Sequence, residues 1–401
     1  MVCKCFLYLC IMKPFRHILS VLIIVVIAVL AVGTVLERLH GTEFAMSHVY
    51  GTWWFVVLWA LVAILMVWMA VKTKMWKRLT VFALHLSFLL ILLGALLTML
   101  TGRHGRMLLQ PGEPTQKYYV GNEVENHPME LPFTLTLDHF EVVNYPGTHK
   151  PMDFVSHIVI GDVSGEEPFT ISMNHILKRR HYRFYQSDYD EKGNSILEVS
   201  RDPWGIGVTY TGYALLFVAL AAMLIERRHG PRAVTWSWLG VLVVLMVFLY
   251  VRMLTHQLLP VLRSPFFSLH ISTIVTAYAL LLAIMVVGII ALIKPKDRAR
   301  LEKLKSLSMS MLYPAVALLA IGIFIGAIWA NVSWGNYWSW DPKEVWALIT
   351  LLVYAAPLHE KQWKTFNKPL FFHVYCILAI LSVIITYFGV NLLLGGIHAY
   401  N

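Results

Sequence analysis

Nine uninterrupted apolar runs constrain the fold of this chain more than any other feature. A run of about 20 apolar residues can cross the hydrocarbon core as a helix, because a helix satisfies its own backbone hydrogen bonds. The chain is 58% hydrophobic and 14% charged, whereas a soluble domain is nearer ~25% charged. The sequence therefore predicts an all-α polytopic membrane protein with about nine transmembrane helices. The runs cover residues 17–36, 52–71, 79–101, 206–225, 234–253, 267–293, 309–331, 343–359 and 369–393.

Lysine and arginine gather on one side of the predicted membrane. They are concentrated in residues 1–16, 72–78, 227–232, 294–305 and 361–368. The short segments on the other side hold Arg38, Arg252, Arg263 and Lys343. Because basic loops stay in the cytoplasm, residues 1–16 are predicted to form a cytoplasmic N-terminus. Within it, residues 1–11 are expected to be an upstream extension without a role. The net charge of +10 is then a topological signal, and no nucleic-acid partner is expected.

Residues 102–205 differ from the rest of the chain, and they follow three predicted helices in residues 17–101. They hold ten Lys and Arg but fifteen Asp and Glu. Phe133, Leu135 and Leu137 alternate with threonines, as in a strand with one buried face. Further strands and turns are predicted at residues 154–160, 195–200, 163–166 and 190–194. After three crossings this region lies outside, so it is predicted to be one small β-rich periplasmic domain.

Two more helices (206–254) precede a final region (255–401), which contains the segment WGNYWSWDPKEVW at 334–346. Its second half has the pattern of a helix start, with Asp341 as the cap, Pro342 as the first helical residue and Glu344 in a capping box.

The first half of the same segment holds an unusual density of aromatic residues. Trp334, Tyr337, Trp338 and Trp340 crowd around Gly335. An aromatic belt at the membrane interface is one explanation. A flat, rigid platform for a planar ligand is the other, and it predicts a binding site at this loop.

Histidines within the predicted membrane region fall on two levels. His270 and His398 lie at outer helix ends, near the aromatic loop, while His85 and His359 lie toward the inner side. About 30 Å of hydrocarbon separates the levels, so one metal cannot bind all four. Each histidine also has an ordinary explanation, as a hydrogen-bonding or interfacial residue. Two imidazoles beside an aromatic platform favour haem with two axial ligands. Rival candidates are His256 and His373.

Four segments carry a resemblance to a known family. Residues 334–350 resemble the tryptophan-rich "WWD" signature of membrane haem-handling proteins, and residues 389–398 are similar to the end of CcsA. Residues 84–94 and 182–189 resemble ResB-like CcsB proteins. From about residue 12 to 401, the chain looks like a CcsB–CcsA fusion, the system II cytochrome c synthase, with residues 255–401 as its CcsA-like haem-handling domain.

This resemblance implies a function and a site. The implied activity is that of a haem lyase, which moves haem to the outer face of the membrane and joins its vinyl groups to the thiols of a CXXCH segment in an exported apocytochrome c. His270 and His398 would be axial ligands of haem b, with its iron reduced, and His85 and His359 would receive haem within the membrane. The remaining haem-contacting residues would be Trp334, Gly335, Trp338, Trp340 and Asp341.

The implied surroundings are those of a multi-pass protein of the bacterial cytoplasmic membrane, in contact with lipid and with its active site facing the periplasm. No cysteine lies in the outer segments, since the four are Cys3, Cys5, Cys10 and Cys376. Thiol-reducing proteins of the periplasm are therefore expected partners. Two other functions use the same residues: a haem transporter or chaperone without ligation activity, and a b-type haem protein that transfers electrons.

Overall fold

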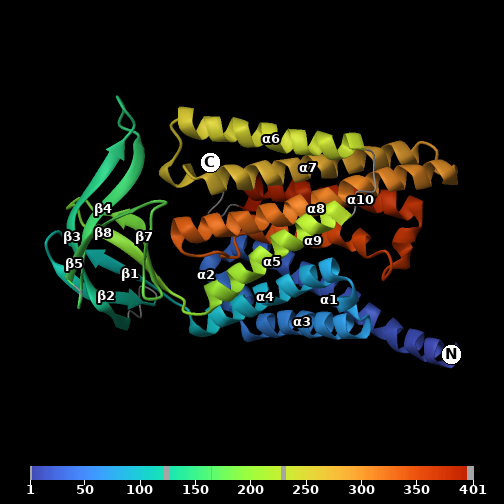
Figure 1. Ribbon diagram of the computed structural model, residues 1–401, viewed down its shortest axis with the longest axis horizontal. Coiled ribbons are helices and arrows are strands. Elements are labelled where there is room, and N and C mark those ends of the chain that lie inside the picture. Colours follow the sequence, from blue (N-terminus) through green and yellow to red (C-terminus); the bar gives the residue numbers. More distant parts are fainter. Residues whose placement is uncertain (1, 122–126, 164, 227–231, 395–401) are drawn as a thin grey trace.

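The computed structural model describes the backbone of residues 2–121, 127–163, 165–226 and 232–394, and the side chains of these ranges except 2–16 and 232–233. The molecule consists of a bundle of long helices with a β-domain at one end (Figure 1). The end of the bundle that carries the β-domain is called the sheet end, and the opposite end is called the far end.

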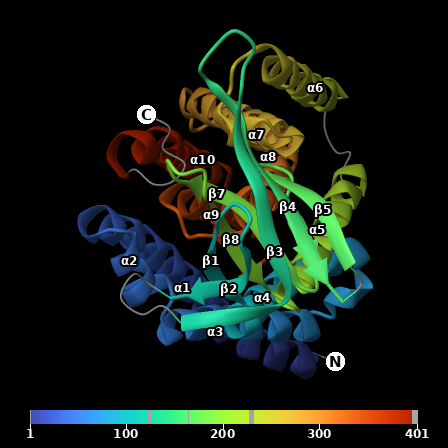
Figure 2. The same cartoon turned by 90° about the vertical axis from the view of Figure 1, so that its left-hand side faces the viewer.

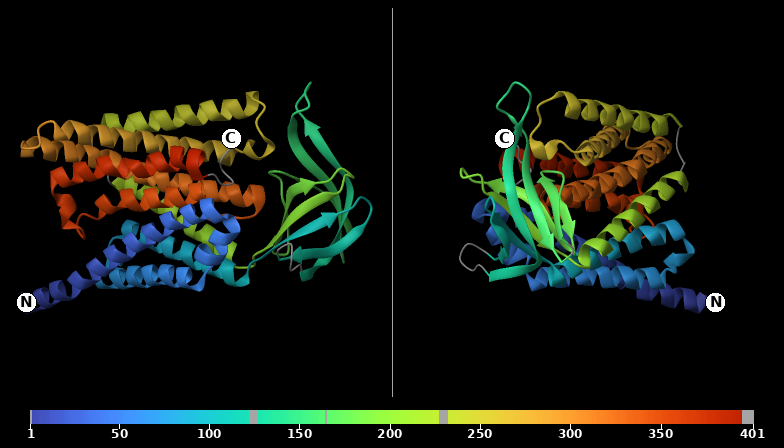
Figure 3. Two further views of the ribbon diagram at one scale, coloured as in Figure 1. Left: turned by 180° about the vertical axis from the view of Figure 1, so that it is seen from behind. Right: turned by 60° about the vertical axis from the view of Figure 1, so that its left-hand side comes forward.

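The helices lie roughly along the long axis of the molecule (Figures 1 and 3). The first group is α1 (Val2–His40), α2 (Thr42–Ala45), η1 (Met46–Tyr50), α3 (Trp53–Lys72), η2 (Met75–Lys77) and α4 (Leu79–Thr101). After the β-domain come α5 (Gly205–Glu226), α6 (Arg232–Thr255), η3 (Pro260–Leu262), α7 (Pro265–Leu292), α8 (Arg298–Trp334), α9 (Pro342–Ala355), η4 (Ala356–His359), η5 (Lys364–Asn367), α10 (Pro369–Ile384) and η6 (Ile385–Leu394).

Eight helices in the described residues are long and apolar enough to cross a membrane, which confirms a polytopic membrane protein. They correspond to all the predicted runs except 343–359. That run forms the shorter helix α9, of 14 residues, followed by the 3₁₀ turn η4. Pro357 explains the early end of α9, because proline clashes with the preceding helical turn and removes an N–H donor.

Two helices extend well beyond their apolar runs. Helix α1 begins at Val2, so residues 2–16 continue the helix instead of preceding it. Helix α8 begins at Arg298, 11 residues before the predicted run at 309. The carboxylate of Asp297 accepts a hydrogen bond from the Arg300 N–H at 3.0 Å and caps this extension. The cap satisfies a backbone N–H group of the first turn, so α8 can begin with charged residues before its apolar run.

The two groups of helices interlock. Helix α1 packs against α9, where Val26 and Leu30 share a buried cluster with Val345 and Ile349. The Trp346 indole N–H also donates to the hydroxyl of Thr34 at 3.1 Å. Helix α6 lies at the edge beside α7 (Figure 2). A site between the two groups is therefore held rigidly by packing.

The β-domain is one antiparallel sheet of eight strands, in the order β5-β4-β3-β2-β1-β8-β7-β6. Its core confirms the predicted alternation, since Phe133, Leu135 and Leu137 are all buried. The predicted strands at 154–160 and 195–200 lie in β4 and β8. The strands are β1 (Arg103–Leu109), β2 (Pro114–Val120), β3 (His127–Asn144), β4 (Pro151–Asp162), β5 (Gly165–Ser172), β6 (Leu177–Arg179), β7 (Tyr182–Tyr189) and β8 (Ser195–Arg201).

The sheet curls until its two outer strands meet. Ile171 of β5 lies in the same buried cluster as Phe184 of β7. Arg179 of β6 donates to Glu167 of β5 at 2.8 Å and to Asp162 at 3.1 Å. These ion pairs join edges that would otherwise expose unpaired strands to other chains.

Polar contacts fix the β-domain on the sheet end of the bundle. The Tyr145 hydroxyl donates to the Leu258 carbonyl at 2.9 Å, and the Asn174 amide donates to the Pro260 carbonyl at 3.1 Å. Arg183 of β7 donates to the side-chain oxygen of Asn331 in α8 at 2.6 Å. The last contact lies beside the aromatic loop, so the sheet and the loop are positioned together.

Candidate functional site

Two of the predicted histidines meet at the far end of the bundle. The rings of His85, in α4, and His359, in η4, have centroids 6.1 Å apart and planes at 87°. Nδ1 of His85 lies 2.7 Å from the Val81 carbonyl, and Nδ1 of His359 lies 2.9 Å from the Ala355 carbonyl. A carbonyl only accepts hydrogen bonds, so each Nδ1 carries the proton. In the neutral rings, each Nε2 keeps its lone pair for a ligand.

The separation of these rings fits one metal between them. An imidazole nitrogen binds a metal at ~2.0 Å and lies ~1.1 Å from its ring centre, so two axial imidazoles have centroids about 6 Å apart. Two histidines can also meet edge to face at this distance without a metal, as other aromatic rings do. The donor set and spacing nevertheless suit the axial ligation of haem.

Trp363 is a neighbour of this pair that the sequence did not single out. Its ring centroid lies 6.0 Å from that of His359, at 62°. Its indole N–H donates to the Ser20 hydroxyl of α1, which fixes the ring. The signal available in the sequence was the spacing, since Trp363 follows His359 by four residues.

At the sheet end, the aromatic loop begins where α8 stops. Gly335 has φ of +88°, a conformation that glycine adopts without strain. A Cβ at this position would lie 2.9 Å from the Tyr185 ring of β7. Buried Asn331 donates to the Gly335 carbonyl at 3.0 Å and accepts from Arg183 and from the Tyr210 hydroxyl. Asn331 was not predicted, although a buried amide in an apolar helix is itself a signal.

The tryptophans of the loop do not form one flat platform as predicted. Trp340 stacks on Tyr50 of η1 with centroids 5.1 Å apart and planes at 7°. Trp338 meets Trp340 edge to face, at 82°. Trp334 likewise meets Trp329 of α8 at 76°. Neighbouring indoles pack edge to face because the positive ring edge is attracted to a negative ring face, so these rings form an angled wall.

This wall contains a buried polar atom without a hydrogen-bond partner among the described residues. The Trp338 indole N–H finds no hydrogen-bond acceptor among the described residues. By contrast, the Tyr337 hydroxyl donates to Thr98 of α4 at 2.6 Å. A buried donor without a partner is costly, and a bound ligand is one means of satisfying it.

The predicted helix start is confirmed at its cap and differs at its third position. Buried Asp341 accepts a hydrogen bond from the Lys343 N–H at 2.9 Å. Glu344 accepts from the Ser339 N–H at 2.8 Å instead of from the N–H of the cap residue. The positive φ of Trp340, 60°, turns the chain so that Ser339 faces the first helical turn. Glu344 therefore connects the aromatic loop, at Ser339, to the first turn of α9.

His270 lies against α8 near this loop. Its Nδ1 is 2.7 Å from the Gly322 carbonyl, so Nε2 again keeps the lone pair of the neutral ring. Its ring lies 6.4 Å from Trp329, at 22°. Gly326 makes room for the ring, because a Cβ there would lie 2.6 Å from Nδ1. The structure thus brings His270 beside Trp329, which packs on Trp334.

The other predicted histidines have different positions. His398 lies outside the described residues. His256 is exposed in a loop after α6 and contacts the Thr255 hydroxyl. His373 is fully buried in α10, with Nε2 3.3 Å from the Leu301 carbonyl. Neither rival takes part in a described contact with the His85–His359 pair or with the aromatic loop.

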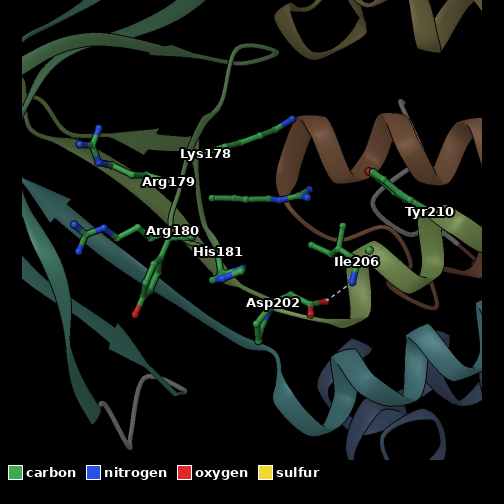
Figure 4. A pocket seen from close by; sticks show the side chains of 11 residues that line it. Lys178, Arg179, Arg180, His181, Asp202, Ile206 and Tyr210 are labelled. Carbon is green, nitrogen blue, oxygen red and sulfur yellow. Dashed lines mark hydrogen bonds between the residues drawn. The ribbon is translucent and has the colours of Figure 1, made fainter.

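A cationic cavity of about 380 Å³ separates the β6–β7 hairpin from the start of α5 (Figure 4). Lys178 extends across it toward the helices, whereas Arg179 and Arg180 point away. Burial, and then repulsion from Arg183, lowers the pKa of Lys178. Arg183 lies near the C-terminus of α8, where the helix dipole favours positive charge. The lysine and arginine side chains that line the cavity give it the charge to accept an anionic group.

Most of the chain matches two protein families. Residues 66–203 match the ResB-like family, and residues 212–398 match the family described as "Cytochrome C assembly protein". The chain thus contains a ResB-like part followed by a part that matches cytochrome c assembly proteins, which is the order of a CcsB–CcsA fusion.

Individual relatives agree with this assignment. The chain is 33% identical to NrfI of Wolinella succinogenes over 204 residues, which are 47% of this chain and 22% of NrfI. It is 33% identical to CcsA of a Synechococcus species over 179 residues, 36% of this chain and 58% of that protein. With CcsA of Pyropia yezoensis the identity is 48% over 102 residues, 25% of this chain and 31% of that protein. The chain thus aligns with between about a fifth and three fifths of these relatives.

Proposed function

We propose that this protein is a cytochrome c synthase, a haem lyase that carries haem to the outer face of a bacterial cytoplasmic membrane and attaches it to exported apocytochrome c. The observation that carries the proposal is the pair of His85 and His359. One histidine belongs to the ResB-like part and the other to the CcsA-like part. A site that needs both parts gives a physical reason for joining them in one chain.

In this proposal, haem b first binds between the two histidines of the far end, on the cytoplasmic side. Each Nε2 offers a lone pair to the iron, and the Nδ1–carbonyl bonds hold the rings in place. Such contacts to the distal nitrogen fix the tautomer and orientation of a ligating imidazole. Trp363 supplies an aromatic surface beside His359.

Haem then occupies the sheet end, on the periplasmic side. His270 is the proposed axial ligand there, and His398 is the second proposed ligand. Trp334, Gly335, Trp338, Trp340 and Asp341 are proposed as the surrounding wall. The support for this arrangement is the position of His270 against α8, two aromatic contacts away from Trp334, and the unpartnered indole N–H of Trp338.

The proposed reaction adds each thiol of the CXXCH segment across one vinyl group of haem. Sulfur bonds to one vinyl carbon and the thiol hydrogen goes to the other, so no electron is gained or lost. The protein contributes by holding the vinyl group and the thiol together. Bringing two reactants into position removes a large part of the barrier for such a step. The iron stays reduced, and thiol-reducing proteins keep the cysteines as thiols.

Reconstitution tests the proposal. The chain would be expressed with an apocytochrome c in cells without their own maturation system. We expect haem that stays on the cytochrome through denaturing electrophoresis. The matched control is an apocytochrome whose two CXXCH cysteines are serines, which should show no covalent haem.

Two results would favour other functions. A chain that is well expressed and loaded with haem, yet leaves the cytochrome without covalent haem, would indicate a transporter or chaperone. Haem that is retained permanently at both levels, with reversible reduction and oxidation, would indicate a b-type electron-transfer protein. Either result would overturn the synthase.

A further inference from the structure

We propose that the outward face of the β-domain contains a binding site for a divalent transition-metal ion such as Zn²⁺, formed by His139, Glu141 and His157. This site lies in the β-domain, apart from the histidines proposed for haem. One ligand atom from each of the three side chains lies within 4.8 Å of the others.

The sheet itself brings these side chains to one face. His139 of β3 is directly opposite His157 of β4, and Glu141 lies two residues farther along β3. A bulge at Asp138 shifts the register by one residue. Without it, the alternation of the strand would place His139 and Glu141 on the buried face.

Distances between the side chains suit a small tetrahedral ion. Nε2 of His157 lies 3.3 Å from Oε1 of Glu141. Two ligands bound to Zn²⁺ at 2.0–2.1 Å in a tetrahedral site are ~3.3–3.4 Å apart. The imidazoles of His139 and His157 are stacked with centroids 4.3 Å apart. The rings must tilt for their lone pairs to converge, and exposure leaves them free to do so, since the side chains are 56% and 32% exposed.

Neighbouring groups hold the other nitrogen of each imidazole. Nδ1 of His139 lies 2.9 Å from the carboxylate of Asp138, and Nδ1 of His157 lies 3.4 Å from the Thr170 hydroxyl. Nε2 is then the ligand nitrogen of both rings. A carboxylate on the distal nitrogen of a ligating histidine, as Asp138 is for His139, is a usual support of a zinc site.

Two nitrogens and one carboxylate leave a fourth position open to water. Two imidazoles and one carboxylate are ligands of intermediate softness. Zn²⁺, Cu²⁺ and Ni²⁺ therefore suit this site better than Ca²⁺ or Mg²⁺, which prefer oxygen ligands. Bound metal would join β3 to β4 on the outward face, beside the bulge that weakens their pairing.

The test uses the full-length, haem-loaded protein in detergent, freed of other metals by dialysis. Equilibrium dialysis against Zn²⁺ followed by elemental analysis gives the zinc bound per chain. We expect His157→Gln and Glu141→Gln each to weaken one zinc site at least about tenfold. His149→Gln, an exposed histidine in the β3–β4 loop, is the matched control and should retain the site.

Thermal unfolding gives a second measurement, in which the comparison of variants separates this site from the other histidines. Zn²⁺ should raise the unfolding temperature of the wild-type protein and of His149→Gln, but not that of His157→Gln. Zinc binding that is unchanged in both site variants would overturn the proposal, as would a wild-type protein that takes up no zinc. The exposed rings would then be a carboxylate-linked histidine pair and nothing more.

Discussion

The two ends of the helix bundle present their histidines in different ways. At the far end, His85 and His359 face each other directly, and each is held by the carbonyl of the residue four positions before it. At the sheet end, His270 is held by α8, and the aromatic loop is tied to the β-domain, to α4 and to η1. The far end is thus a pair of facing histidines held by local contacts, whereas the sheet end is an aromatic wall held by contacts from several elements.

The difference shows what most of the aromatic loop does. Trp340 stacks on Tyr50, Tyr337 bonds to Thr98, and Gly335 fits against Tyr185. These contacts position the loop, and the indole N–H of Trp338 is among the buried groups without a hydrogen-bond partner in the described residues. In the proposed function, the sheet-end site, which is fixed by contacts on several sides, holds haem for reaction. The far-end histidine pair binds haem and releases it. The following variants test that distinction.

The largest expected effect is at the far end. His85→Ala and His359→Ala each remove one of the two imidazoles. The affinity of the far-end site for haem should therefore fall by more than ~10–100-fold, which is the loss of metal affinity that follows removal of a supporting contact. The measurement is haem absorbance per protein. His256→Ala, which removes an exposed histidine, is the control and should have no effect.

Added imidazole sharpens this comparison. It should restore haem to a cavity that has lost one ligand, if the rest of the site is intact. Wild-type haem content in both His85→Ala and His359→Ala would show that the pair is an ordinary edge-to-face contact between helices.

A smaller effect is expected at the sheet end from Gly326→Ala. The added methyl would lie 2.6 Å from Nδ1 of His270, so the ring must move away from the Gly322 carbonyl. We expect about tenfold less covalent haem on the co-expressed cytochrome, as for the loss of a supporting contact. Gly207→Ala places the same methyl in open space on α5 and should leave the yield unchanged.

The position of the His270 ring is itself measurable in these variants. Haem spectra should differ between Gly326→Ala and the wild type, and His270→Ala should regain covalent haem when imidazole is added. Equal yields from Gly326→Ala and Gly207→Ala would contradict a ligand role for His270 in this geometry.

The smallest effect concerns the helix cap. Asp341→Ala removes the acceptor of the Lys343 N–H and should destabilise the first turn of α9 by about 1 kcal/mol. Hydrogen exchange of the backbone amides of residues 343–346 should become about fivefold faster. Asp341→Asn retains a good cap and should exchange at the wild-type rate. Slow exchange in Asp341→Asn combined with loss of haem would show that the carboxylate charge serves the ligand as well.

Much of the helical architecture followed from hydrophobicity, but helix ends and packing did not. The run at 79–101 matches α4 residue for residue, because a membrane span is set by apolar length. The span at 343–359 was less well predicted, since Pro357 ends α9 early. The flat aromatic platform was wrong, because ring orientation depends on neighbours such as Tyr50 that are distant in sequence.

The sequence by itself determined the membrane class, the alternating core of the β-domain, the cap at Asp341 and the identity of the candidate histidines. These follow from local properties: hydrophobic length, strand period and helix-start chemistry. Only the tertiary structure decided that His85 and His359 face each other, that Trp340 stacks on Tyr50 and that His139 lies beside His157. Such contacts depend on how helices and strands pack and on one residue of register, which no short stretch of sequence encodes.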